Sequence, residues 1–231
     1  RRIRARRSSR SRPMWFERLI VYDDRAPAGA ALNMALDEAL LELSSAPVLR
    51  FYRWERPALS FGYFGKFADV ADETRELVRR WTGGGIVPHG EDLTYSLITP
   101  ASHPAFAQGP PAVYAALHAA IREALRAENL QVELATAAAL KISDACFANP
   151  VRDDLLLDGR KIAGAAQRRT RAGFLQQGSI QIPQLPQAFR ERFACALSPA
   201  LETREIPASV HARAAVLAAQ KYATDAWLRR C

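Results

Sequence analysis

The chain has 231 residues, of which 49% are hydrophobic and 24% charged. This profile predicts a soluble protein with one sizeable core and excludes a disordered or fibrous chain. No stretch approaches the roughly 20 apolar residues of a membrane-spanning helix, so we expect no membrane partner. The net charge of +8 raises the question of nucleic acid.

Residues 1–13 carry most of this charge. They contain seven arginines and no acidic residue, so that without them the net charge falls to +1. A segment of arginine and serine with one isoleucine has little to bury, which predicts a disordered tail at 1–13 and a folded domain at 14–231. Because the body is nearly neutral, we expect no nucleic-acid partner. A nucleic-acid arm and an organelle transit peptide are the alternatives for the tail.

Periodicity along 14–231 predicts interleaved helices and strands. The expected helices cover 30–43, 69–78, 110–129, 185–194 and 208–229, and the expected strands cover 48–54, 58–61, 92–99, 154–157, 160–167 and 174–182. Asp158 and Gly159 lie between two of these strands and form the dipeptide that favours a type I′ hairpin turn. The fold class we expect is therefore α+β, with mixed, largely antiparallel sheets flanked by helices.

The first candidate site is a run of three glycines, Gly83, Gly84 and Gly85, with Arg80 before it and His89 after it. Such a loop can bring backbone amides close to a ligand. Its spacing matches neither the dinucleotide fingerprint nor the P-loop, and a glycine triplet alone is more typical of a plain loop.

The second candidate is the strand that begins at Lys161. Strict alternation places Lys161 on the same face as Ala163 and Ala165, with Gly164 on the other. A strand of such small residues packs poorly unless a ligand or a close backbone fills the space. The alternative is a tight contact between sheet and helix.

Three cysteines, Cys146, Cys195 and Cys231, are an odd number without C-x-x-C spacing. Neither a disulfide framework nor a metal site is supported, and we expect a cytoplasmic protein without metal. Cys146 lies fifteen residues before Lys161, whose ammonium could promote its thiolate and make it a nucleophile. Its alternative role is that of a small buried hydrophobe.

Three tracts together resemble the lipoate-protein ligases and protein octanoyltransferases of the biotin/lipoate ligase superfamily. They are the helix at 31–38, Arg-Arg-x-Thr-Gly-Gly at 79–84 with His89, and Gly-Arg-Lys-Ile-Ala-Gly-Ala-Ala-Gln at 159–167. The resemblance implies one ligase-like catalytic domain with Lys161 as the active-site lysine. The acyl-pocket residues that it implies are Arg80, Thr82, Gly83, Gly84, Gly85, His89, Gly164 and Ala165.

Two chemistries occur in that family. Transferases move an octanoyl or lipoyl group from acyl carrier protein through a cysteine thioester, with no cofactor, whereas ligases use ATP and Mg and form lipoyl-adenylate. Cys146 with Phe147 and Pro150 resembles the transferase cysteine segment, while Gly85 is more typical of ligases. We therefore favour a Cys146 transferase, with the ligase as the alternative and a catalytically silent acyl-binding protein as a second one.

The partners that this resemblance implies are acyl carrier protein and the lipoyl domains of 2-oxoacid dehydrogenases or the glycine cleavage H protein. Acidic faces on such carriers would suit a local basic surface. The candidate docking residues are Arg75, Arg79, Arg152, Arg168, Arg169 and Arg171.

Overall fold

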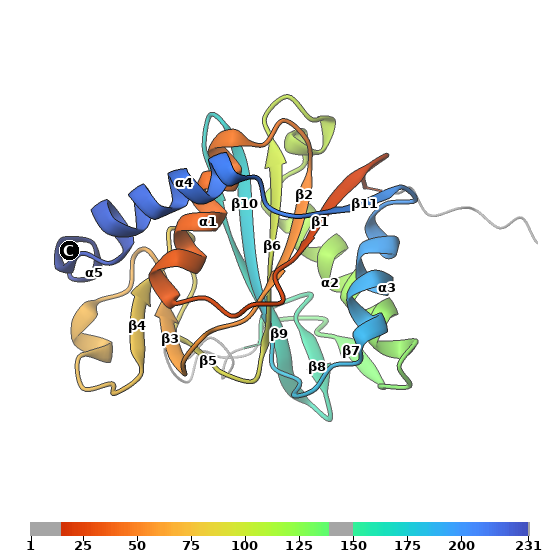
Figure 1. The fold of residues 1–231 in the computed structure, drawn as a ribbon. Coiled ribbons are helices and arrows are strands. Elements are labelled where there is room, and N and C mark those ends of the chain that lie inside the picture. Colours follow the sequence, from red (N-terminus) through yellow and green to blue (C-terminus); the bar gives the residue numbers. More distant parts are fainter. Residues whose placement is uncertain (1–14, 139–149, 231) are drawn as a thin grey trace, which may run out of the picture.

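An eight-stranded mixed sheet lies at the centre of the computed structural model, which describes residues 15–138 and 150–230 (Figure 1). Its strand order is β11-β1-β2-β6-β10-β9-β8-β7, and a second, three-stranded sheet has the order β4-β3-β5. The strands are β1 (Leu19–Asp23), β2 (Val48–Tyr52), β3 (Ala58–Phe61), β4 (Glu76–Arg79), β5 (Val87–His89), β6 (Leu93–Pro100), β7 (Val132–Leu134), β8 (Leu155–Leu157), β9 (Arg160–Arg169), β10 (Gly173–Ile180) and β11 (Leu201–Arg204).

Helices cover both faces of the large sheet (Figure 1). They are α1 (Ala30–Leu43), α2 (Pro110–Arg126), α3 (Gln187–Leu197), α4 (Ala208–Leu217) and α5 (Asp225–Leu228). Helices α2 and α3 pack with one set of alternating strand residues, and α1 and α4 pack with the other. The expected α+β class with flanking helices is confirmed, and no helix of the described ranges is long and apolar enough to cross a membrane.

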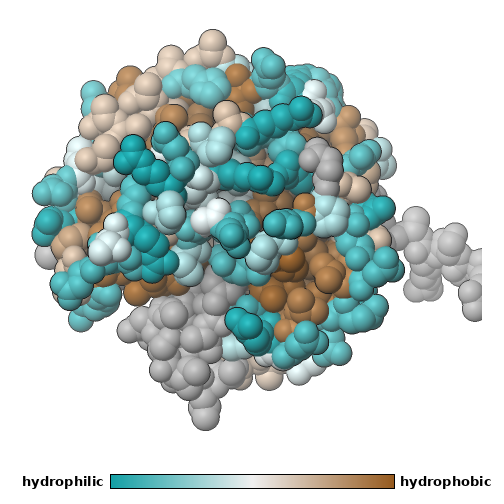
Figure 2. Space-filling model, turned by 60° about the horizontal axis from the view of Figure 1, so that its bottom comes forward, coloured by the Kyte–Doolittle hydropathy of each residue, from teal (hydrophilic) through white to brown (hydrophobic). Residues whose placement is uncertain are grey.

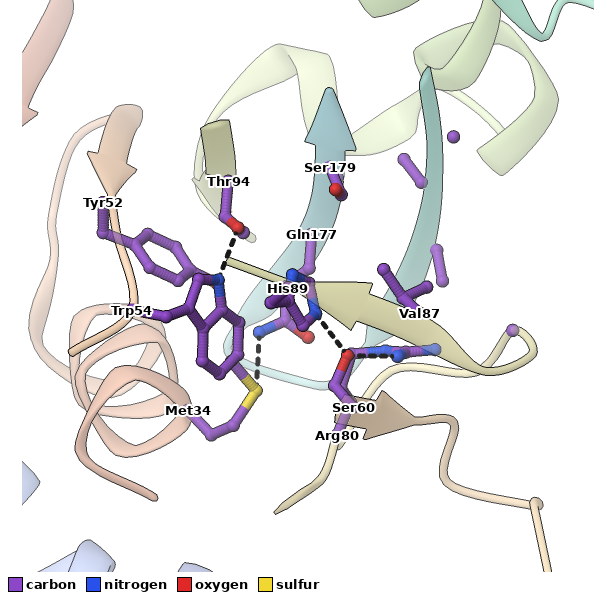
Figure 3. A pocket seen from close by; sticks show the side chains of 15 residues that line it. Met34, Tyr52, Trp54, Ser60, Arg80, Val87, His89, Thr94, Gln177 and Ser179 are labelled. Atoms are coloured by element: carbon purple, nitrogen blue, oxygen red, sulfur yellow. Dashed lines mark hydrogen bonds between the residues drawn. The ribbon is translucent and has the colours of Figure 1, made fainter. Parts of the chain in front are cut away.

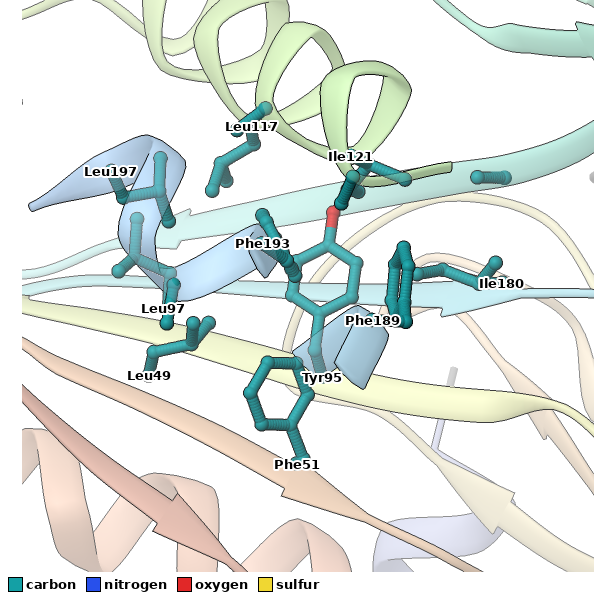
Figure 4. Packing of buried hydrophobic residues seen from close by; sticks show 14 of the residues in the cluster. Leu49, Phe51, Tyr95, Leu97, Leu117, Ile121, Ile180, Phe189, Phe193 and Leu197 are labelled. Carbon is teal, nitrogen blue, oxygen red and sulfur yellow. The ribbon is translucent and has the colours of Figure 1, made fainter. Parts of the chain in front are cut away.

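Alternation along the strands creates these two cores. In β2, Leu49 and Phe51 face α2 and α3, whereas Val48 and Tyr52 face α1. Figure 4 shows Tyr95 of β6 in the first core, packed among aromatic and aliphatic side chains, with its hydroxyl directed toward α2. Each face of the sheet therefore carries a hydrophobic core, the back covered by α2 and α3 and the front by α1 and α4.

Several predicted elements match the structure closely, and the strand expected at 58–61 is β3, Ala58–Phe61. The first helix spans Ala30–Leu43, as expected from its apolar spacing. Asp158 and Gly159 have φ values of 50° and 75°, and these left-handed conformations are those of a type I′ turn. This turn leads the chain directly into β9.

The predicted helix at 69–78 is wrong. A short 3₁₀ turn, Phe67–Val70, is followed by β4, which pairs in parallel with β3. Pairing with a distant strand overrode the local helical pattern there. The expected helix at 208–229 is also interrupted, because a wide π-helical turn, Ala218–Tyr222, separates α4 from α5.

Candidate active site

A pocket opens where the front of the large sheet meets the small sheet (Figure 3). It is lined by Met34, Tyr52, Trp54, Ser60, Arg80, Gly84, Val87, His89, Thr94, Gly164, Ala165, Ala166, Gln177, Gly178 and Ser179. Apolar side chains supply much of this surface. The polar residues among them are mostly bonded to one another, as described below.

Arg80 holds the glycine loop in place. Its guanidinium donates to the carbonyls of Gly83 at 3.0 Å and Gly85 at 2.7 Å, and to Ser60 Oγ at 2.7 Å. A β-carbon on Gly62, just past β3, would lie 2.0 Å from the Gly84 carbonyl oxygen. Only glycine allows the loop to approach β3 so closely.

His89 belongs to a buried chain of hydrogen bonds. Its Nδ1 lies 2.8 Å from Asp92 Oδ2, and its Nε2 lies 2.6 Å from Ser60 Oγ. We assign the proton to Nδ1, because that nitrogen faces the carboxylate, so that Nε2 accepts from the serine hydroxyl. Burial lowers the pKa of His89 although Asp92 opposes the shift, which favours the neutral ring.

Asp92 collects four donors from three elements. Besides His89, it accepts from Ser179 Oγ at 2.6 Å, Thr94 Oγ1 at 3.0 Å and the Gly90 amide at 3.1 Å. Burial alone would raise the pKa of Asp92, but these donors hold it below its ordinary value. The carboxylate therefore ties β5, β6 and β10 together behind the pocket.

Trp54 lies against His89 and forms the next part of the pocket wall. Its indole donates to Thr94 Oγ1 at 2.8 Å and stacks on the His89 ring, with 4.0 Å between the ring centroids (Figure 3). The tryptophan thus presents a flat apolar surface to the pocket while its one polar atom is bonded.

A second polar chain lies under the pocket. Thr82 donates to Gln177 at 2.7 Å, and Gln177 donates to Asp37 of α1 at 2.8 Å and to Met34 Sδ at 3.3 Å. Asp37 is paired with the fully buried Arg50 at 2.8 Å. This chain fixes α1 against the sheet, and with it the Met34 side chain that lines the pocket.

Lys161 does not follow strict alternation, so its predicted face is wrong. Strand β8 pairs Leu155 with Ala163 and Leu156 with Lys161, which leaves Ile162 as an extra residue. A β-carbon on Gly164 would lie 2.7 Å from Lys161 Cε, so the lysine side chain runs across Gly164. This β-bulge brings Lys161 to the side of the strand that carries Gly164, a pocket residue.

Lys161 is nearly buried and forms an ion pair with Asp154, with 2.8 Å between Nζ and Oδ2. It also lines a groove next to the pocket, with Pro88, Leu157, Arg160, Ile162, Gln181, Ile182 and Pro183 among its other walls. The end of the molecule that holds the β8–β9 turn carries an apolar patch bordered by hydrophilic side chains (Figure 2). The Lys161 amine therefore lies between the pocket and this groove.

Of the predicted pocket residues, Arg80, Gly84, His89, Gly164 and Ala165 line the pocket. Thr82, Gly83 and Gly85 are not among the lining residues, but they form the hydrogen bonds to Gln177 and Arg80 given above. Cys146 lies outside the described residues, as do the tail at 1–13 and Cys231. Cys195 is exposed on α3.

Arg79 was a predicted docking residue, and the structure contradicts this. It is 1% exposed, and it donates to carbonyl oxygens of Tyr63, Gly65, Trp227, Leu228 and Arg230. Arg79 therefore anchors the segment around α5 to the small sheet. Arg152 and Arg171 are exposed, while Arg75, Arg168 and Arg169 are partly buried.

Sequence reasoning did not name Trp54, Ser60, Asp92, Asp154 or Gln177 as site residues. The alternation of Asp92, Thr94 and Ser96 was a usable signal, since it puts polar side chains on one face of a strand. The other residues depend on pairing between distant segments, which local patterns do not reveal. Within the described ranges, no group of three or more His, Cys, Asp or Glu side chains is arranged to hold a metal ion.

Comparison with known families adds to this geometry. The model of the lipoyl protein ligase A/B catalytic domain matches residues 29–222, which include α1, the pocket and Lys161. This chain belongs to that family. The predicted family is confirmed, and the match covers nearly all of both sheets.

Curated relatives of this catalytic domain carry the name octanoyltransferase LipM. The protein from Oceanobacillus iheyensis is 39% identical over 170 residues, which cover 69% of this chain and 62% of the relative. The protein from Macrococcus caseolyticus is 30% identical, over 86% of this chain and 94% of its own length. The first of these matches thus covers less than two thirds of the relative.

Solved structures share the catalytic-domain fold. Ta0514 from T. acidophilum, with bound lipoic acid, has a TM-score of 0.74 at 20% identity and covers 94% of this chain and 100% of its own. Lipoate-protein ligase A bound with ATP has a TM-score of 0.67 at 19% identity and covers 93% of this chain and 98% of its own. At such identities the likeness concerns the fold.

Proposed function

We propose that this protein is an acyltransferase of protein lipoylation that moves an octanoyl group from acyl carrier protein to a lysine of a lipoyl domain. The observation that carries the proposal is the apolar pocket beside Lys161, in a chain 39% identical to a protein named octanoyltransferase. The covalent intermediate is a thioester on Cys146. No ATP is required, because that thioester conserves the free energy of the carrier thioester.

The pocket suits an alkyl chain. The ring nitrogens of His89, the carboxylate of Asp92 and the indole nitrogen of Trp54 are all engaged with protein groups, so the wall offers mainly apolar contact. Six or seven buried methylenes contribute about 5 kcal/mol, at about 0.8 kcal/mol each. The acyl tail therefore supplies much of the binding energy and is selected by its length.

Lys161 acts at the carbonyl end of this chain. In the first step Cys146 Sγ, as thiolate, attacks the thioester carbon of the donor, and the carrier thiolate leaves and takes up a proton. In the second step the amine of the acceptor lysine attacks the same carbon, the Cys146 thiolate leaves, and the amine loses a proton. The ammonium of Lys161 stabilises the oxyanion in both steps, and the adjoining groove admits donor and acceptor in turn.

The test is acylation of the intact chain by octanoyl-acyl carrier protein, followed by mass spectrometry. The wild-type protein gains the mass of one octanoyl group and then transfers it to a lipoyl domain. Cys146→Ser abolishes the adduct, whereas the matched Cys195→Ser, at an exposed thiol, retains it. Octanoylation of a lipoyl domain by Cys146→Ser with free octanoate and ATP would instead support the ligase.

A further inference from the structure

The segment that carries Asp154 is held from behind by α2. Asp154 is completely buried, and its carboxylate accepts from Lys161 Nζ at 2.8 Å, from the Val151 amide at 2.6 Å and from the Tyr114 hydroxyl. The carboxylate thus joins the Lys161 ammonium to the segment before β8 and to α2.

One turn further along α2, His118 contacts Asp153, the residue just before Asp154. Its Nδ1 lies 2.7 Å from the backbone carbonyl oxygen of Asp153, and its ring packs edge-on against Tyr114 with 4.1 Å between centroids. Side chains four residues apart lie on one face of a helix, so Tyr114 and His118 grip two consecutive residues from one rigid element. These contacts with α2 therefore set the position of Asp154.

The lysine needs such a restraint. A lysine side chain has four rotatable methylenes, so fixed partners are needed to hold its ammonium at one position. Lys161 also borders a groove that is open to solvent. A buried ion pair seldom stabilises a fold, because desolvation of the two charges offsets their attraction. Fold stability alone is thus a weak reason for burying Asp154 beside Lys161.

Gly164 shows the result of the restraint. A β-carbon there would lie 2.7 Å from Lys161 Cε, 3.0 Å from Nζ and 3.7 Å from Asp154 Oδ1. The paired charges therefore occupy the space that a side chain at 164 would need, against the strand that lines the pocket.

We propose that Asp154 is the positioning residue of the reaction: its carboxylate, fixed by Tyr114, holds the Lys161 amine across Gly164 beside the acyl pocket. This inference rests on the proposed function, since it presumes that Lys161 takes part in acyl transfer. Asp154 itself touches no substrate and acts through the lysine.

The test compares Asp154→Asn with Asp153→Asn, which removes the same charge one residue away. The Asp153 side chain makes no hydrogen bond or ion pair among the described residues, and at its φ of 69° asparagine is readily accommodated. Steady-state rates of octanoyl transfer from octanoyl-acyl carrier protein to a lipoyl domain give kcat and KM. Asp154→Asn lowers kcat about 100-fold, the cost of a misplaced catalytic group, with KM within about twofold of wild type. Asp153→Asn has the wild-type kcat.

Two further variants separate the possible outcomes. If Lys161→Ala is inactive while Asp154→Asn keeps kcat within threefold of wild type, the positioning role is wrong and the proposed function stands. If Lys161→Ala keeps full activity, the proposed function fails. Should Asp154→Asn not fold, Tyr114→Phe decides: a drop of about tenfold in kcat at constant KM supports the inference, and an unchanged kcat overturns it.

Discussion

The pocket wall around His89 and the cluster around Lys161 use buried polar groups in different ways. In the wall, His89, Asp92 and Ser60 satisfy one another. In the cluster, the ion pair lies near His118 Nε2 and the Tyr95 hydroxyl, two buried atoms without a hydrogen-bond partner among the described residues. A satisfied network stabilises a shape, whereas an ion pair among unsatisfied groups is costly and is better explained by the amine that it places.

The largest effect on stability is expected in the wall. Asp92→Asn replaces a carboxylate that accepts from four donors by an amide that must turn its NH₂ toward some of them. We expect a loss of about 3 kcal/mol in the free energy of unfolding, measured in urea. Glu91→Gln, at the exposed neighbour, should change it by less than about 0.5 kcal/mol. A loss below about 1 kcal/mol for Asp92→Asn would contradict the view that the hydrogen bonds of Asp92 stabilise the pocket wall.

The next effect concerns activity and belongs to the cluster. In Gly164→Ala the new methyl group displaces the end of the Lys161 side chain, so the acylation rate should fall about 100-fold. The free energy of unfolding should change by no more than about 1 kcal/mol, since the displaced atoms end a flexible chain. Gly90→Ala is the control, because nothing lies within 4 Å of a β-carbon there. A wild-type rate for Gly164→Ala would contradict the placement of the lysine.

The smallest effect appears as a pH dependence. Burial lowers the pKa of His118 from 6.5 to about 4, so the unfolded chain binds a proton before the folded one does. The contribution of this residue to stability is complete above pH 6.5 and is lost as the pH falls toward 4. At pH 5 the loss is about 2 kcal/mol relative to pH 7.

His118→Leu should remove this part of the acid sensitivity in urea titrations at both pH values. His211→Leu, on the exposed face of α4, should keep the wild-type difference. Equal pH dependence in wild type and His118→Leu would show that the imidazole is not held in its neutral form.

Sequence patterns predicted the parts of the fold that depend on neighbouring residues. The helix at 30–43 and the turn at Asp158 and Gly159 follow from spacing and turn preference. Strands β1 and β11 were not predicted, because each is short and pairs in parallel with a segment far away in the chain. The predicted helix at 69–78 failed for the same reason.

The candidate site also has parts that depend on neighbouring residues and parts that depend on distant ones. Arg80, His89 and Gly164 belong to motifs that are visible in the sequence, and the structure brings them to one pocket. Asp154 lies within the expected hairpin, but its importance depends on α2, which ends at Arg126, 28 residues earlier in the chain. The face of Lys161 was predicted wrongly because alternation assumes that paired strands advance residue for residue.

The extra residue Ile162 also bears on how related chains are compared. Successive side chains of a strand point to opposite faces, so the number of residues between Lys161 and Gly164 decides which face the lysine occupies. The bulge at Ile162 shifts this alternation by one residue. A relative that lacks the bulge could keep its lysine in the same alignment column and yet direct it into the opposite core. The number of residues between the turn at Asp158 and Gly159 and the pocket is therefore a better guide to the direction of the lysine side chain than the presence of a lysine alone.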